Sequence, residues 1–140
     1  MRKYDNFCKA LENLGIGAEL EEPYSVVEQT GIAALFGICF EQSWKLMKAL
    51  LEESGRTEQR TGSPRAIIKT AYECGLINDR EGWLELLETR NILAHSYSDE
   101  DSLAAIRSVK STFLPLFRDL KDEIVKNWSD YAADDPETQR

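Results

Sequence analysis

Apolar residues recur at intervals of three and four along most of the chain, which is the spacing of one face of an α-helix. The pattern predicts five helices, and no stretch shows the apolar–polar alternation of a half-buried strand. The expected helices cover 3–14, 23–53, 63–74, 79–97 and 99–128. We therefore predict an all-α fold, an up-and-down antiparallel bundle of about five helices with a four-helix core.

Glycine and proline residues define the expected ends of these helices. Gly15 and Gly17 are expected to stop the first helix, because glycine readily adopts the left-handed conformation that ends helices. Pro23 suits the first turn of the second helix. Pro115 should kink the last helix, because a proline inside a helix removes a backbone hydrogen bond.

The second predicted helix has a wider apolar face than one core-facing stripe requires. It also contains Gly31, Ala33, Ala34 and Gly37, which leave a smooth surface for another helix. One interpretation is a central helix that is fully buried within a monomer. The interpretation that we favour is a helix covered on one side by the bundle and on the other by a second copy, so we expect a homodimer.

Composition and charge narrow the class of protein. The 140 residues suffice for one domain, and 42% hydrophobic with 30% charged residues fits a soluble globular chain. The net charge of −8 argues against a protein that coats nucleic acid, although a local basic site is compatible with it. Residues 129–140 contain four acidic residues and one arginine. We expect a domain over 1–128 and an acidic, disordered tail over 129–140.

Several sites and locations are not expected. The longest uncharged apolar run, 31–40, is too short to span a membrane, and the first residues lack an apolar signal core, so we expect a cytoplasmic protein. Cys8, Cys39 and Cys74 form no Cys-x-x-Cys pair and are interpreted as small buried hydrophobic residues. With one histidine and no clustered ligands, we expect no metal site and no cofactor.

The candidate chemistry is concentrated in 90–97, which contains the only histidine of the chain. An arginine can hold a phosphate, an imidazole can move a proton, and an amide and a tyrosine lie beside them. These residues are Arg90, Asn91, His95 and Tyr97. A purely structural interpretation is also open, because a histidine near a helix C-terminus is favourable to the helix dipole. On a regular helix Arg90 and His95 lie about 140° apart, which favours either a break near Ala94 or a wide cleft such as one between two subunits.

A second cluster of cations lies in the predicted loop 54–62 and just after it. A basic loop that leads into a helix N-terminus can face a phosphate, although loop charges are often only solvated. The candidate RNA- or nucleotide-binding residues are Arg56, Arg60 and Arg65, together with Lys110 from the last helix.

The stretch 90–97 resembles the Arg-x4-6-His-x-Tyr signature of HEPN proteins. Four further blocks, taken in order, resemble the nucleotidyltransferase substrate-binding family, a HEPN branch of helical bundles. These blocks are Phe40-Glu41-Gln42-Ser43-Trp44-Lys45-Leu46-Met47-Lys48, Gly62-Ser63-Pro64-Arg65, Gly75-Leu76-Ile77 and Phe113-Leu114-Pro115-Leu116-Phe117. The resemblance covers nearly the whole chain except the acidic C-terminal end.

The resemblance implies a metal-independent endoribonuclease that combines the motif residues of two protomers. It implies His95 as general acid and base, Arg90 as the group that holds the scissile phosphate, and Asn91 as an orienting amide. In HepT-type members the motif tyrosine accepts AMP from a partner, which implies Tyr97 as the acceptor. The implied partner is a minimal nucleotidyltransferase from an adjacent gene, in a toxin–antitoxin module.

The resemblance also allows a second function without catalysis. The chain would then be the substrate- or nucleotide-binding subunit of a two-chain nucleotidyltransferase. It lacks the Gly-Ser and paired-Asp signature of the catalytic subunit, so we expect no nucleotidyltransferase activity of its own.

Overall fold

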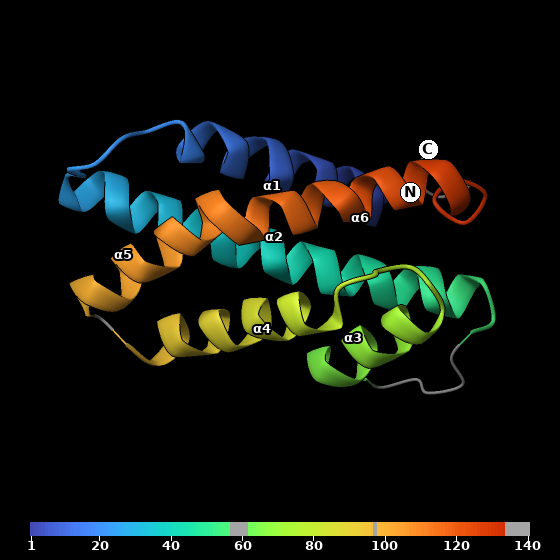
Figure 1. The fold of residues 1–140 in the computed structure, drawn as a ribbon. Helices are drawn as coiled ribbons and strands as arrows, with labels where there is room; N and C mark the ends of the chain where they lie inside the picture. Colours follow the sequence, from blue (N-terminus) through green and yellow to red (C-terminus); the bar gives the residue numbers. More distant parts are fainter. Residues whose placement is uncertain (57–61, 97, 134–140) are drawn as a thin grey trace.

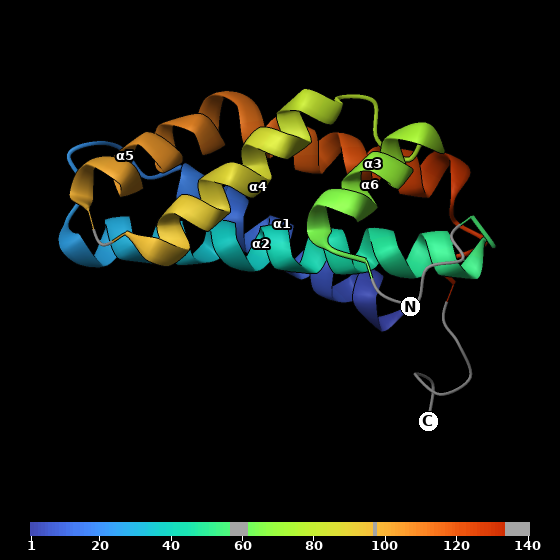
Figure 2. The ribbon, with the colours of Figure 1, turned by 90° about the horizontal axis from the view of Figure 1, so that it is seen from below.

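The computed structural model describes residues 1–56, 62–96 and 98–133, and within these ranges every regular element is helical. The predicted all-α fold is confirmed. The long helices run lengthwise beside one another and alternate in direction, and the short α3 packs on α2 and α4 (Figures 1 and 2). The elements are α1 (Arg2–Ala18), α2 (Val26–Glu53), α3 (Pro64–Glu73), α4 (Arg80–His95), α5 (Asp99–Ser108), a π-helical turn η1 (Val109–Phe113) and α6 (Leu114–Asn127).

The first helix is longer than predicted. α1 continues through both glycines to Ala18, and neither glycine has a positive φ. A Cβ built on Gly17 would lie 3.2 Å from Leu35 Cδ1 and 3.5 Å from Ile32 Cγ1, both on α2. The glycine therefore permits close packing of α1 on α2, and the prediction that it ends the helix was wrong.

The second helix begins later than predicted because a capping box fixes its start. The Ser25 hydroxyl accepts a hydrogen bond from the Glu28 amide at 3.1 Å, and the Glu28 carboxylate accepts one from the Ser25 amide at 2.9 Å. α2 therefore starts at Val26, and Pro23 precedes it. At about 1.5 Å per residue, its 28 residues extend over about 42 Å, most of the length of the bundle.

The other helix boundaries follow the sequence signals. Ser63 caps α3, Pro64 occupies its first turn, and Asp79 caps α4 by accepting from the Gly82 amide at 2.9 Å. Gly75 has a φ of 79°, which only glycine adopts at low cost, and it ends the turn that follows α3.

Residues 99–127 form one continuous helical segment that contains the expected irregularity at Pro115. Directly before Pro115 the backbone widens into η1, where the Leu114 amide donates to the Val109 carbonyl. A proline lacks an amide donor, and its ring presses on the preceding turn. The wider π-helical turn accommodates it, and the chain changes direction between α5 and α6 (Figure 1).

The core contains aromatic side chains from several helices. The ring centroid of Phe117 on α6 lies 6.5 Å from the centroids of Phe7 and Phe36. It lies 5.6 Å from that of Trp83, and these two rings meet edge to face. All four side chains are fully buried. Through Phe117 these contacts join α1, α2 and α4 to α6 around one core.

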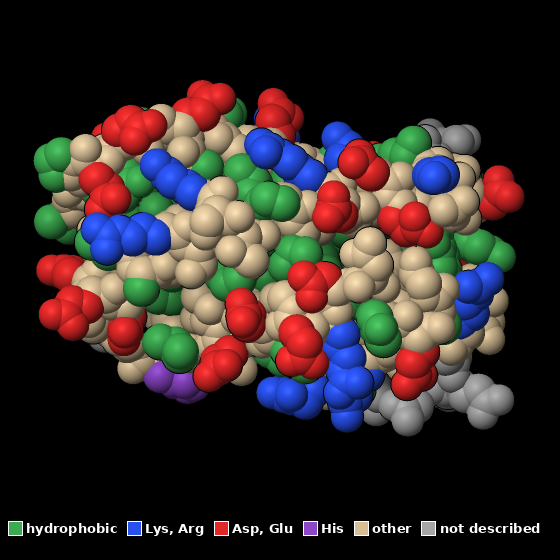
Figure 3. All heavy atoms as spheres, in the orientation of Figure 1, with side chains coloured by type: hydrophobic (Ala, Val, Ile, Leu, Met, Phe, Trp, Pro, Cys, Tyr) green, Lys and Arg blue, Asp and Glu red, His purple; other side chains and the backbone are tan. Residues whose placement is uncertain are grey.

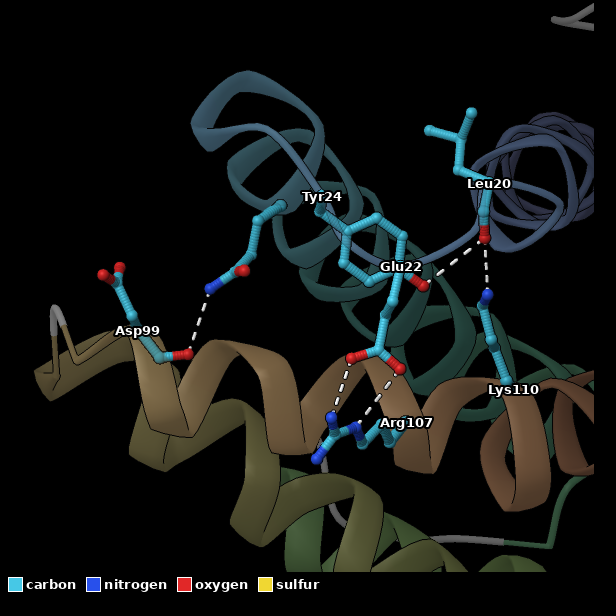
Figure 4. Close-up of polar contacts among 7 residues, drawn as sticks. Leu20, Glu22, Tyr24, Asp99, Arg107 and Lys110 are labelled. Atoms are coloured by element: carbon cyan, nitrogen blue, oxygen red, sulfur yellow. Dashed lines mark hydrogen bonds and ion pairs between the residues drawn. The ribbon is translucent and has the colours of Figure 1, made fainter.

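The connection from α1 to α2 is attached to α5 and η1 by polar contacts (Figure 4). The Arg107 guanidinium donates to the Glu22 carboxylate at 2.7 Å and lowers the pKa of that carboxyl. The Lys110 ammonium donates to the Leu20 carbonyl, and Gln29 of α2 donates to the Asp99 carbonyl at 3.0 Å. The connection is therefore held along much of its length.

The described part of the predicted tail packs on the bundle. The Tyr131 ring lies 5.9 Å from that of buried Trp128, and Tyr131 and Ala132 both contact the core. The N-terminal amine donates to the Ala132 carbonyl at 3.0 Å, so the two ends of the described chain meet. Residues 134–140 lie outside the described residues.

We expect a chain that ends at Trp128 to unfold at a lower temperature than one that ends at Ala133, because it loses the Tyr131 and Ala132 contacts. Partial burial of one aromatic ring is worth on the order of 1 kcal/mol, or several degrees in a domain of this size. Differential scanning calorimetry of both chains and of the full chain measures this. Equal unfolding temperatures for all three would mean that the turn after Trp128 contributes nothing.

Candidate functional site

Arg90 lies on the C-terminal half of α4, against the middle of α2. Its Nη2 lies 3.6 Å from Glu41 Oε2, and its guanidinium carbon lies 5.3 Å from the centre of the Phe40 ring. Both distances are within the range of an ion pair and of a cation–π contact. The Arg90 side chain is 29% exposed, so its guanidinium is held against α2 with part of its surface open to solvent.

The two ends of the Arg90 guanidinium differ in their surroundings. Its Nε is buried and has no hydrogen-bond partner within the described part of the chain. Among the described residues, no group accepts a hydrogen bond from the guanidinium, and Glu41 is its only ion-pair partner. A cation with unused donors at a solvent-facing surface is suited to an anionic ligand.

His95 is the last residue of α4 and is exposed, as is Asn91 one turn before it. The next residue, Ser96, has extended backbone, so the helix ends directly after the histidine. Arg90 and His95 therefore share one regular helix and lie about 140° apart around it. Of the two alternatives, a break near Ala94 does not occur, because α4 is helical through His95, and the two side chains leave the helix in different directions. Tyr97 lies outside the described residues.

Two serines shape the connection that follows His95. Ser96 donates to the Asp101 carboxylate at 2.7 Å and accepts from the Ser98 amide at 3.1 Å. Ser98 in turn caps α5. Beside Ser96 a cleft of about 280 Å³ lies between the start of α2 and the start of α5. Its lining residues are Tyr24, Val26, Gln29, Thr30, Ala33, Ser96, Asp99 and Ser102.

The predicted basic residues do not gather around the motif. Arg56 follows the C-terminal end of α2. It contacts the Trp128 ring at 4.7 Å and donates to the Cys74 carbonyl at 3.4 Å. Arg65 is exposed on the first turn of α3, and Lys110 is bound to the α1–α2 connection. Arg60 lies outside the described residues. Figure 3 shows acidic side chains spread over one face, with the basic groups in separate clusters.

Phe40 and Glu41, the two side chains that contact Arg90, stand out in the sequence only as the start of a block that resembles the family, and the sequence pattern assigned them no role in the site. The position of Glu41 in the sequence was the one signal that could have indicated a partner for it. Glu41 directly follows an uncharged apolar run of ten residues, so it is the first charge after a long apolar stretch of α2. A charged group in such a position usually has a partner.

α2 exposes apolar and small residues on the side away from the core. Val27 is 81% exposed and Ile38 52% exposed, and Gly31 and Ala34 lie between them on the same face at spacings of three and four. Ile92 of α4 is 45% exposed. The apolar surface of α2 therefore exceeds what the bundle core covers. No helix among the described residues is long and apolar enough to cross a membrane.

Comparison with known proteins gives a family and a curated relative. A family described as "Nucleotidyltransferase substrate binding protein like" matches residues 2–126. A Haemophilus influenzae protein named "Probable ribonuclease HepT" is 30% identical over 90 residues, which are 61% of this chain. The alignment spans 62% of that relative, about three fifths of its length.

Two solved structures are similar in fold. A Thermus thermophilus protein has a TM-score of 0.70 and 30% identity, over 86% of this chain and 96% of its own. A Haemophilus influenzae protein has a TM-score of 0.70 and 23% identity, over 87% of this chain and 98% of its own. The latter is described as revealing the fold of a substrate binding domain of a nucleotidyltransferase.

Proposed function

Since this chain belongs to the nucleotidyltransferase substrate-binding protein family, of HEPN and HepT-like type, we propose that it is the HEPN subunit of a two-component module. In this proposal it cleaves RNA without a metal ion, and a minimal nucleotidyltransferase from an adjacent gene regulates it as an antitoxin. The observation that carries the proposal is the pair on α4. Arg90 is a cation held against α2 whose guanidinium has no hydrogen-bond acceptor among the described residues, and His95 is an exposed imidazole at the helix end.

These two residues have the chemistry that RNA cleavage requires. His95 in its neutral form takes the proton of a 2′-hydroxyl, whose oxygen attacks the adjacent phosphorus. The bond from phosphorus to the 5′-oxygen breaks, and that oxygen takes up the proton that the imidazole removed from the 2′-hydroxyl, so His95 acts first as base and then as acid. Arg90 stabilises the charge that develops on the phosphoryl oxygens, and Asn91 orients the phosphate or the imidazole. The products are a 2′,3′-cyclic phosphate and a 5′-hydroxyl.

The angle between Arg90 and His95 supports a site shared by two copies of the chain. The exposed residues Val27, Gly31, Ala34 and Ile38 of α2 offer an apolar face for a second copy. Such a homodimer would bury on the order of 1,200–2,000 Å² in total. It would bring two sets of motif residues to one cleft that is wide enough for an RNA strand.

We expect light scattering at micromolar concentration to give the mass of two chains, and Ile38→Glu to give the mass of one. A buried, unpaired carboxylate at the interface costs several kcal/mol. Val125→Glu, which changes a residue of α6 that is 58% exposed, is the matched control and should remain dimeric. A single-chain mass for the unmodified protein would contradict the dimer.

Tyr97 is proposed as the residue to which the nucleotidyltransferase attaches AMP, because it follows His95 by two positions. An added AMP would compete with RNA and would bring a negative charge into the motif. Incubation of both proteins with ATP, followed by peptide mass spectrometry, should detect AMP on Tyr97 and none on a Tyr97→Phe variant. AMP addition at an unchanged rate in Tyr97→Phe would exclude this acceptor.

A second candidate is a non-catalytic subunit that binds a nucleotide or an acceptor substrate for the nucleotidyltransferase. The cleft of about 280 Å³ beside Ser96 favours it, because hydroxyl and amide side chains line much of that cleft. Incubation of the purified chain with RNA in EDTA separates the two candidates. Cleavage that weakens with rising salt supports the ribonuclease, since an acidic protein holds RNA through a few local cations. Absence of cleavage, together with binding of a nucleotide by the same chain, supports the second candidate.

A further inference from the structure

Glu41 of α2 lies between two cations on the surface of the bundle. Its Oε1 is 3.5 Å from the Lys45 ammonium one turn further along α2, and its Oε2 is 3.6 Å from Arg90 Nη2 on α4. Lys45 belongs to the same helix, so its contact is local. The contact with Arg90 joins two helices, and Glu41 is the only carboxylate within the described residues that pairs with that guanidinium.

Three features restrict the Arg90 side chain together. The face of the Phe40 ring lies 5.3 Å from the guanidinium carbon, the Glu41 carboxylate lies at the Nη2 end, and the Nε atom is buried at the other end. Arginine has many rotamers, and holding it in one of them before a ligand binds lowers the entropic cost of binding. The Phe40 ring limits movement of the guanidinium towards the ring, and Glu41 limits rotation of the guanidinium within its own plane.

We infer that Glu41 is a positioning residue, which holds Arg90 in the orientation that receives the scissile phosphate. This inference rests on the proposed ribonuclease function. Because the carboxylate is anionic, it also repels a phosphate that approaches Arg90. Glu41 therefore has two opposing effects: it orders the guanidinium for the transition state, and it weakens binding of the RNA ground state.

These opposing effects predict that kcat and KM respond differently to the loss of Glu41. Loss of the carboxylate in Glu41→Ala leaves Arg90 disordered, and kcat should fall about tenfold or more, since misplacement of a catalytic group by about 1 Å is costly. KM should stay equal or fall, because the repulsion is removed. Glu41→Gln keeps the length of the side chain and an oxygen near Nη2 but loses the charge, so it should recover part of kcat. If the ion pair were purely structural, its loss would change the unfolding temperature and would leave the ratio of kcat to KM unaltered.

The experiment measures kcat and KM with a short labelled RNA for the unmodified protein, Glu41→Ala, Glu41→Gln and Lys45→Gln. Lys45→Gln is the matched control, because it removes the other ion pair of Glu41 and leaves Arg90 untouched. It should cleave at the normal rate. In parallel, solvent exchange of the Arg90 Nε–H is followed by NMR, with the resonance assigned from its absence in Arg90→Ala. Exchange should be slow in the unmodified protein and faster in Glu41→Ala.

The outcomes separate this inference from the proposed function. A lower kcat without a higher KM in Glu41→Ala, with partial recovery in Glu41→Gln, supports the positioning role. An active unmodified protein with unchanged kcat in Glu41→Ala overturns the positioning role and leaves the ribonuclease intact. An unmodified protein that does not cleave RNA overturns both. Unchanged Nε–H exchange in Glu41→Ala shows that Glu41 does not hold Arg90, whatever the activity, and overturns the inference.

Discussion

Replacing His95 by alanine is expected to reduce RNA cleavage by about a hundredfold or more, which is the usual contribution of a general acid or base. The variant should unfold at the same temperature as the unmodified protein. His95 is exposed at the end of α4 and forms no hydrogen bond or ion pair within the described residues. Single-turnover cleavage of a labelled RNA, together with thermal unfolding, measures both quantities.

Arg90→Ala should reduce the rate of RNA cleavage by a similar factor, because it removes the group that stabilises phosphoryl charge. Arg90→Lys is the matched variant. It keeps a positive charge but lacks the planar guanidinium that lies over Phe40, so it should remain strongly impaired. Full activity in both His95→Ala and Arg90→Ala would place the cleavage elsewhere. Unfolding of His95→Ala would instead support the structural interpretation of the motif.

Replacing Phe117 by alanine is expected to lower the free energy of unfolding by about 3–5 kcal/mol, the range for large buried aromatic residues. Phe117 is fully buried and contacts aromatic rings of α1, α2 and α4, so the cavity would open where four helices meet. Urea unfolding at a fixed protein concentration measures the change.

Val125→Ala is the control for this prediction, because Val125 is exposed on the same helix. It should change the free energy of unfolding by about 0.5 kcal/mol or less. A loss below about 1 kcal/mol in Phe117→Ala would mean that the four-ring cluster does not organise the core.

The fold was largely predictable because the apolar spacing along the chain is strong and most helices begin directly after a capping residue. Ser63, Asp79 and Gly75 act as their types predict. Gly17 does not, since its role depends on Leu35 and Ile32, which are distant in sequence. A glycine that ends a helix and one that allows close packing give the same local signal, and only the tertiary contacts distinguish them.

The candidate site was predictable only as a motif. The stretch 90–97 supplies the types of residue, but the contacts of Arg90 come from α2, about fifty positions earlier. The same limit applies to Arg56 and Lys110. Their charges suggested a phosphate-binding surface, whereas the fold directs them to the Trp128 ring and to the Leu20 carbonyl. Long cationic side chains contact whatever the fold brings near, and the order of residues along the chain does not contain that information.

The central claim is metal-independent cleavage that uses the RNA 2′-hydroxyl, and the ends of the products test it most directly. We predict that mass spectrometry of RNA cleaved by the purified protein in EDTA will find a 2′,3′-cyclic phosphate on one fragment and a 5′-hydroxyl on the other. A single 2′-deoxy substitution at the cleaved nucleotide should abolish cleavage there. Fragments with a 5′-phosphate, produced only when Mg²⁺ is added, would contradict the account.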